Sequence, residues 1–307
     1  MGALIEGQWR SDDEWRRVKG AFVRENAQFR SWLNDDDRFP FEPGRYHLYV
    51  SYACPWAHRT LIVRELMGLA PAIGVSVVEP LMLKNGWEFS TRRPDSINDC
   101  SFAYQLYQLA KGDYSGRVTV PILWDREAKV IVNNESSEII RMFNRLPQDA
   151  SRAMNLYPTA LQAQIDSVND RVYGSVNNGV YRAGFATTQG AYVDAVNRLF
   201  ETLDWLDETL THRPYLVGDT LTEADIRLFV TLIRFDAVYV SHFKCSRRRI
   251  VDYPSLWSYV RRLYAIPAFQ KTTHLDEIKE HYYGSHPTIN PTGIIPVGPD
   301  LSWVAQS

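Results

Sequence analysis

Cysteine is scarce in this sequence, and its cysteines are far apart. The 307 residues contain only three, Cys54, Cys100 and Cys245. Disulfide-built secreted domains are rich in cysteine and dithiol redox proteins carry Cys-x-x-Cys, so both classes are excluded. No set of cysteines and histidines has the spacing of a metal site. We therefore expect a reducing compartment and no bound metal.

Long apolar runs and an excess of charge are also missing. No stretch approaches the roughly 20 apolar residues that cross a bilayer. The N-terminus carries acidic residues such as Glu6 and Glu14, which argue against a signal or transit peptide. The formal net charge of −2 gives no electrostatic attraction to nucleic acid or to a membrane surface. The sequence therefore predicts a cytoplasmic protein with neither nucleic acid nor membrane as its partner.

The most informative segment is Cys-Pro-Trp-Ala-His-Arg at residues 54–59. It follows a predicted strand over 46–50 and begins an apolar-periodic helix over about 56–67. Cys54 therefore lies at the helix entry, with Pro55 at the first helical position. The N–H groups and dipole of a helix N-terminus lower the pKa of a thiol there. An inert buried cysteine is the alternative, but the strand, the proline and the helix together favour a reactive one.

The residue three positions after Cys54 is Ala57, so no neighbouring thiol can close a disulfide with it. A mixed disulfide formed at Cys54 must therefore be resolved by an external thiol, unless the reaction forms none. His58 and Arg59 follow within one helical turn, where a structural role is favoured over a catalytic one.

The length favours two domains. In the first half, the apolar pattern predicts strands over 46–50, 73–79, 118–124 and 130–132 and a helix over 135–143, which make a small sheet covered by helices. The polar and aromatic residues 84–116 interrupt this pattern as an insertion, and residues 1–40 show no clear period. Pro121 indicates an edge, a turn or a cis bond, and the sequence does not choose between them.

The second half has helical periodicity from Ala150 to Tyr283. Helices are expected over 192–210 and 225–239. Thr222 and Asp225 have the spacing of a capping box with Leu221 as its apolar staple, which we interpret as folding information rather than chemistry.

Taken together, these features resemble a cytosolic glutathione transferase, in which a thioredoxin-like α/β domain precedes an all-α domain. The chain is similar in particular to the glutathionyl-hydroquinone reductases, the Xi class of that superfamily. The motifs that carry the resemblance are residues 51–59, 86–89, 116–121, 133–138, 184–189, 221–227, 234–239, 281–283 and 290–294. The resemblance implies an N-terminal extension (1–44), a thioredoxin-like glutathione-binding domain (45–148), a helical domain (149–285), a C-terminal strap (286–307) and a homodimer.

The same resemblance implies an activity and its residues. The Cys54 thiolate would attack the sulfur of a glutathionyl-hydroquinone, release the hydroquinone and leave a mixed disulfide that a second glutathione resolves. Tyr181 would supply the proton, while Tyr239 and Tyr282 would lower the pKa of Cys54. Glutathione, a co-substrate and not a permanently bound cofactor, would contact Trp87, Arg117, Val118, Thr119, Val120, Glu135 and Ser136. For Glu135 and Ser136, ordinary helix capping is an equally good interpretation.

Two other functions stay open at this point. An omega-like thioltransferase or dehydroascorbate reductase would use the same cysteine with a different second pocket; Trp87, Tyr181 and the long tail argue against it. A non-catalytic glutathione-fold binding module would have no need of a thiolate, and the complete motif around Cys54 argues against this class.

Overall fold

The computed structural model describes residues 2–11, 17–18, 21–22, 26–35, 37–146 and 154–300. The chain forms two compact units, Met1–Trp15 with Glu25–Met154 and Arg16–Arg24 with Asn155–Ser307. The predicted boundary between residues 148 and 149 and the predicted start of the helical half at Ala150 lie outside the described residues. The predicted domain bounds therefore stay a prediction. None of the described helices is both long and apolar enough to cross a membrane.

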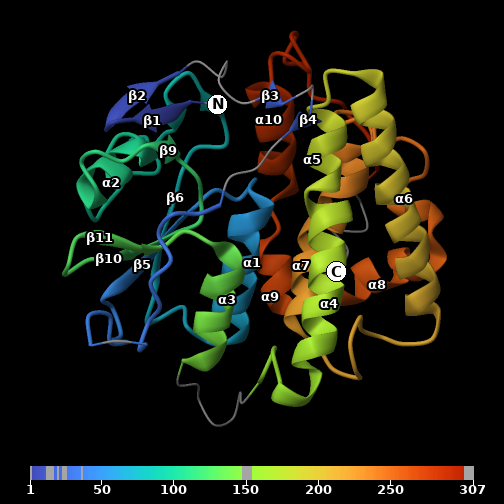
Figure 1. Ribbon diagram of the computed structural model, residues 1–307, viewed down its shortest axis with the longest axis horizontal. Helices are drawn as coiled ribbons and strands as arrows, with labels where there is room; N and C mark the ends of the chain where they lie inside the picture. The colour runs from blue at the N-terminus through green and yellow to red at the C-terminus, as the bar shows by residue number, and fades with distance from the viewer. Residues whose placement is uncertain are drawn as a thin grey trace. The chain divides into compact units, whose positions relative to one another are not determined.

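The first unit is built on a four-stranded sheet with the strand order β11-β10-β5-β6 (Figure 1). Its strands are β5 (Tyr46–Val50), β6 (Gly74–Val77), β10 (Ile122–Asp125) and β11 (Val130–Asn133). β6 is parallel to β5, whereas β10 is antiparallel to both of its neighbours. Every residue of β5 is buried, as expected for a central strand with both faces covered.

Helices cover this sheet. α1 (Pro55–Leu66) packs against α3 (Ser136–Arg145), while α2 (Ala103–Ala110) contacts β11. The predicted strand over 46–50 and the helix that follows Cys54 are both confirmed. The strand expected over 118–124 begins only at Ile122, after a cis bond between Val120 and Pro121. Of the three possibilities left open for Pro121, the structure has the cis bond.

Two segments are more regular than the sequence indicated. Residues 84–116 contain α2 and the short strand β8 (Gly86–Trp87), and a second short strand, β9 (Gly116–Arg117), begins at the end of this range. The N-terminal segment forms β1 (Ala3–Ile5) and β2 (Gln8–Arg10), and β1 pairs with β9. Strands of two or three residues are too short to show a period, which is why the sequence pattern missed them.

The second unit is helical, with α7 (Glu223–Arg234) at its centre, since every residue of α7 is buried. Its other elements are the hairpin β3 (Arg17–Val18) and β4 (Ala21–Phe22), η2 (Thr159–Leu161), α4 (Gln162–Val172), η3 (Tyr173–Asn177), α5 (Gly179–Gly184), α6 (Gln189–Thr211), η4 (Phe235–Tyr239), η5 (Ile250–Asp252), α8 (Pro254–Tyr264), α9 (Pro267–Thr272) and α10 (Leu275–Ser285). The helix predicted over 192–210 is confirmed within α6, although Val193, expected on its apolar face, is 43% exposed.

The helix predicted over 225–239 changes character along its length. It is an α-helix to Arg234 and then a π-helix, η4, over the next five residues. The predicted capping box is present at its start: the Asp225 carboxylate accepts a hydrogen bond from the Thr222 N–H at 2.8 Å and a second from the Thr222 hydroxyl. The capping box therefore explains where α7 begins, while the π-helix alters which side chains η4 presents.

Candidate active site

Cys54 is the N-cap residue of α1, and Pro55 occupies the first helical position. The backbone of Cys54 is extended, with φ −74° and ψ 119°. Its carbonyl accepts the N–H of His58, which starts the helical hydrogen bonds. Cys54 is partly exposed. The sulfur therefore lies at the positive end of the helix dipole, in the position that the sequence predicted.

The Cys54 thiol donates a hydrogen bond to the carbonyl oxygen of Val120, with a sulfur–oxygen distance of 3.4 Å. This contact brings the cysteine to the segment Arg117–Val120, which was expected to bind glutathione. Val120 is buried, and the three residues before it are partly exposed.

Tyr107, in α2, holds the same segment from the other side. Its hydroxyl donates to the Thr119 carbonyl at 2.8 Å and accepts from the Thr119 N–H at 3.2 Å and from Asn134 Nδ2 at 3.0 Å. Burial raises the pKa of Tyr107, so the hydroxyl keeps its proton. Both backbone groups of Thr119 are thereby used inside the protein. Tyr107 was not predicted from the sequence, although its partner Asn134 lies in the motif at residues 133–138.

Glu135 and Ser136 begin α3. Glu135 is the N-cap residue, and its carboxylate accepts hydrogen bonds from the Ser137 N–H at 3.0 Å and the Ser137 hydroxyl at 2.8 Å. The capping interpretation of Glu135 is therefore correct, and a contact with glutathione would be an additional role. The buried Ser136 hydroxyl accepts from the Arg59 guanidinium at 3.4 Å.

Arg59 is 1% exposed, and its guanidinium also lies over the Trp56 ring at 4.5 Å. It joins α1, which Cys54 caps, to the first residue of α3. Arg59 therefore contacts a predicted glutathione-binding residue, and its structural role stays a prediction; His58 beside it is fully buried.

Trp87 and Arg117 lie on short strands. Trp87 is buried in β8, where it pairs with Met82 of β7 (Met82–Leu83). Arg117 ends β9 and pairs with Ala3. These pairings show what fixes the backbone at the two positions. Contact of their side chains with glutathione stays a prediction.

The second unit brings the three predicted tyrosines together, although they come from α5, η4 and α10. The hydroxyl of Tyr282 hydrogen-bonds that of Tyr181 and lies 3.0 Å from that of Tyr239. Tyr239 and Tyr282 are buried, and burial raises the pKa of each well above its usual value. Tyr181 is only partly buried. Tyr239 and Tyr282 therefore keep their protons, and the hydrogen-bonded chain of three hydroxyls ends at Tyr181, its most accessible member.

Aromatic rings surround this chain. Phe243 lies 5.5 Å from Tyr181 and stacks on Tyr239 at 5.4 Å, measured between ring centroids. A Cβ atom added to Gly184 would lie 2.2 Å from the Phe243 ring. Any side chain at position 184 would therefore displace the Phe243 ring, so this position requires glycine.

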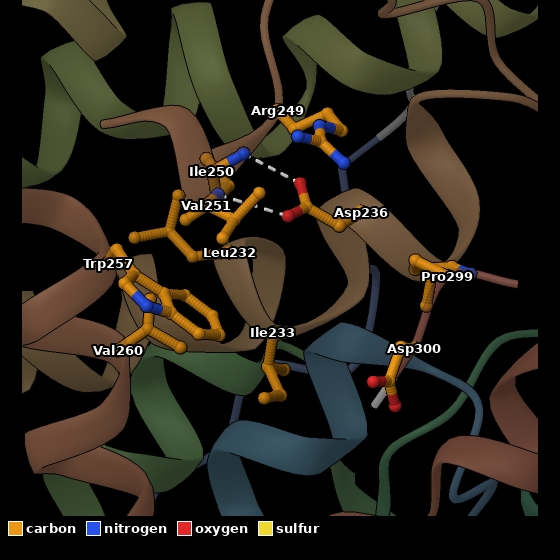
Figure 2. A pocket seen from close by; sticks show the side chains of 11 residues that line it. Leu232, Ile233, Asp236, Arg249, Ile250, Val251, Trp257, Val260, Pro299 and Asp300 are labelled. Atoms are coloured by element: carbon orange, nitrogen blue, oxygen red, sulfur yellow. Dashed lines mark hydrogen bonds between the residues drawn. The ribbon is translucent and has the colours of Figure 1, made fainter. Parts of the chain in front are cut away.

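A separate pocket of about 210 Å³ lies in the second unit and contains none of the predicted site residues (Figure 2). Its lining is mostly apolar, with Leu232, Trp257 and Val260 among the residues shown. Asp236 belongs to η4 and accepts hydrogen bonds from the backbone N–H groups of Ile250, at 2.6 Å, and Val251, at 3.1 Å. Asp236 thus anchors η5 to the π-helix that carries Tyr239.

No group of three or more histidine, cysteine or acidic side chains with the geometry of a metal site occurs in the described part of the chain. Cys54 and Glu135 belong to the first unit, and the three tyrosines belong to the second.

The comparisons with known proteins agree with this geometry. Residues 53–146 match the model of the glutathione S-transferase N-terminal domain, and residues 161–262 match that of the C-terminal domain. A glutathionyl-hydroquinone reductase of Sphingobium chlorophenolicum is 55% identical over 306 residues, which cover 97% of this chain and 96% of that protein.

Solved structures agree as well. The Xi glutathione transferase of Phanerochaete chrysosporium superposes with a TM-score of 0.91 at 52% identity, covering 95% of this chain and 98% of that one. A glutathione-bound glutathione transferase homologue of Escherichia coli K-12 gives a TM-score of 0.90 at 49% identity, covering 99% and 97%.

The fold, an α/β thioredoxin-like unit with a cysteine at a helix entry and a separate helical unit, defines a glutathione transferase. The chain belongs to the Xi class of that family, the class of the glutathionyl-hydroquinone reductases. The family and fold predicted from the sequence are confirmed.

Proposed function

We propose that this protein reduces glutathionyl-hydroquinones to hydroquinones with glutathione as the reductant. The observation that carries the proposal is the position of Cys54, at the N-terminus of α1 with its sulfur 3.4 Å from the Val120 carbonyl oxygen. A thiol at a helix N-terminus is activated as a nucleophile, and this one adjoins the segment proposed to bind the tripeptide.

In the first half-reaction, the Cys54 thiolate attacks the sulfur of the thioether between glutathione and the aromatic ring. A sulfur–sulfur bond forms and the sulfur–ring bond breaks, while the ring carbon takes a proton. The hydroquinone leaves, and Cys54 is left in a mixed disulfide with glutathione. The ring has gained two electrons, which the two sulfurs have supplied.

In the second half-reaction, a glutathione thiolate attacks the glutathione sulfur of the mixed disulfide. Glutathione disulfide is released and Cys54 returns as a thiolate. This step is ordinary thiol–disulfide exchange, which proceeds fastest when the attacking thiol has a pKa near the ambient pH. An external thiol is needed here because position 57 holds alanine.

An aromatic carbon is a poor leaving group unless it is protonated as the bond breaks, so the first half-reaction needs an acid. We assign that role to Tyr181, the most accessible member of the tyrosine chain. Tyr282 donates to or accepts from Tyr181 and is itself held by Tyr239. That the last two also lower the pKa of Cys54 stays a prediction.

Glutathione would lie along Arg117–Val120, with Trp87 against it and its γ-glutamyl end at Glu135 and Ser136. A helix N-terminus offers N–H groups to a carboxylate, and the Glu135 carboxylate can take the ammonium group. Thr119 has both backbone groups bound to Tyr107 and the Val120 carbonyl accepts from Cys54, which leaves the backbone of Val118 and the N–H of Val120 as the better placed partners. We further propose a cytoplasmic homodimer.

The experiment is steady-state turnover of a glutathionylated hydroquinone in excess glutathione, with the freed hydroquinone measured by chromatography. We expect release that iodoacetamide abolishes. Exchange of glutathione disulfide at Cys54 without hydroquinone release would instead identify a thioltransferase. Binding of glutathione that alkylation leaves unchanged, with no turnover, would identify a binding module.

A further inference from the structure

Two segments of the second unit are joined by a series of side-chain contacts, and these contacts end on a histidine pair. The first segment is η4 and the residues directly after it, and the second is the last turn of α10. Tyr239 meets Tyr282 through their hydroxyls, and the Tyr283 hydroxyl donates to the Ala237 carbonyl at 3.3 Å. One helical turn beyond Tyr282, the chain reaches His286, the C-cap residue of α10.

The last contact between the two segments is a hydrogen bond between His242 and His286. Nε2 of His242 lies 3.0 Å from Nδ1 of His286, and the two side chains are buried. The His286 ring also packs edge to face on Tyr282, with 5.7 Å between centroids. A hydrogen bond between two imidazoles needs one N–H and one bare nitrogen, so it requires that the pair is not doubly protonated.

The surroundings keep the pair neutral. Burial lowers the pKa of His242 to about 4, and Lys244 acts in the same direction. Burial, His281 and His242 lower the pKa of His286 well below its usual value, against a hydrogen bond with the Tyr282 backbone that raises it. At neutral pH the imidazole–imidazole hydrogen bond is therefore intact.

We infer that the His242–His286 hydrogen bond is a positioning device for Tyr282 and, through its hydroxyl, for Tyr181 in the reductase reaction. The inference rests on the proposed function, since Tyr181 acts there as the proton donor. The pair fixes the end of α10 against the residues that follow η4, one turn from Tyr282. Proton transfer requires hydroxyls within hydrogen-bond reach of the reacting atom, so a small shift of this turn slows it.

Comparing the rates of the two half-reactions distinguishes positioning of Tyr181 by the histidine pair from a general effect on the structure. Only the first delivers a proton to the ring. The second is thiol–disulfide exchange at Cys54 and takes no proton from the tyrosines. Loss of the histidine pair should therefore slow hydroquinone release far more than it slows resolution of the mixed disulfide, which Tyr282 affects only through the pKa of the departing Cys54 thiol.

The test exploits which nitrogen of each ring is used. A glutamine places its amide about where Nε2 of histidine lies, and an asparagine places its amide about where Nδ1 lies. His242→Gln should therefore retain the hydrogen bond and His242→Asn lose it, while His286→Asn should retain it and His286→Gln lose it. We expect single-turnover hydroquinone release about tenfold or more slower in each variant that loses the bond, given the cost of small misplacements in catalysis.

A matched control is Tyr259→Phe, which removes a buried hydroxyl that donates to Asp225 at 2.9 Å elsewhere in the second unit. It should leave both half-reactions unchanged. A wild-type protein that releases no hydroquinone would overturn the proposed function and this inference together. If the wild type is active, two results would overturn this inference alone. One is that His242→Asn and His286→Gln are no slower than His242→Gln and His286→Asn. The other is that both half-reactions slow equally in the variants that lose the bond.

A measurement on the unaltered protein guards against variants that fail to fold. Nitrogen-15 NMR of the histidine rings should show His242 and His286 as neutral tautomers from pH 8 to pH 5. Protonation of both rings within that range would leave no bare nitrogen to accept the hydrogen bond and would contradict the arrangement.

Discussion

The sulfur of Cys54 lies 3.4 Å from the carbonyl oxygen of Val120, so the cysteine at the helix entry and the segment before Pro121 share one site. The contact has a chemical consequence. A thiol can donate to this carbonyl whereas a thiolate has no proton to donate, so Val120 favours the thiol while the N-terminus of α1 favours the thiolate.

Replacement of Cys54 by serine should abolish reduction of glutathionyl-hydroquinones, by roughly a thousandfold or more, because a hydroxyl is a far weaker nucleophile at neutral pH. The measurement is hydroquinone release at saturating glutathione. Cys100→Ser is the control: burial raises the pKa of Cys100 to about 12, so this thiol is inert and its loss should not affect the rate. Retained turnover in Cys54→Ser would rule out the mechanism.

Tyr181→Phe should slow hydroquinone release by roughly 100-fold to 10,000-fold, the usual contribution of a positioned general acid. Reduction of a preformed Cys54–glutathione disulfide should keep its wild-type rate. Both rates are accessible by rapid mixing and quenching. An unchanged rate of release would remove Tyr181 as the acid and leave the tyrosine chain with a packing role.

Tyr107→Phe should weaken glutathione binding, because it removes the hydroxyl that holds both backbone groups of Thr119 and the amide of Asn134. We expect a higher KM for glutathione and a loss of about 1–3 kcal/mol in the free energy of unfolding, since buried partners are left unsatisfied. Tyr46→Phe is the matched control, since it removes a single hydrogen bond to Pro40 in the same unit. A rise in KM that is equal in the two variants would refute this role for Tyr107.

The free energy of unfolding should fall as the pH drops from about 6.5 towards 4. An unfolded histidine takes up a proton near pH 6.5, whereas His242 does so only at a pKa of about 4 in the folded protein. Between these values the unfolded state binds more protons, so stability rises with pH and is lost on acidification, by about 3 kcal/mol at most for this residue.

Urea unfolding at pH 7.5 and at pH 5 measures this dependence. His242→Gln should make it shallower, and replacement of the exposed His212 should leave it unchanged. An identical pH dependence in wild type and His242→Gln would show that His242 is not held neutral in the folded protein.

Local patterns predicted the part of the site that lies close together in the sequence. The strand over 46–50, Cys54 at the cap and Pro55 at the first helical position needed only periodicity and capping preferences. The three tyrosines come from positions 181, 239 and 282, and no spacing joins them. They were predicted only through the family resemblance. In the structure, their hydroxyls are connected by hydrogen bonds.

Other features were beyond the sequence for physical reasons. Tyr107 acts from an eight-residue helix, which is too short for a clear period. The hydrogen bond between His242 and His286 depends on a π-helical turn and on a helix end, neither of which has a distinct sequence signal. Contacts of this kind arise from tertiary packing, so they require the fold.

The most direct test of the central claim is a single turnover with no free glutathione. The protein is mixed with an excess of glutathionyl-hydroquinone and quenched, and hydroquinone and intact protein mass are measured in the same sample. We predict one hydroquinone released for each protein chain, together with one glutathione bound at Cys54. Hydroquinone released with no glutathione on Cys54 would contradict this mechanism.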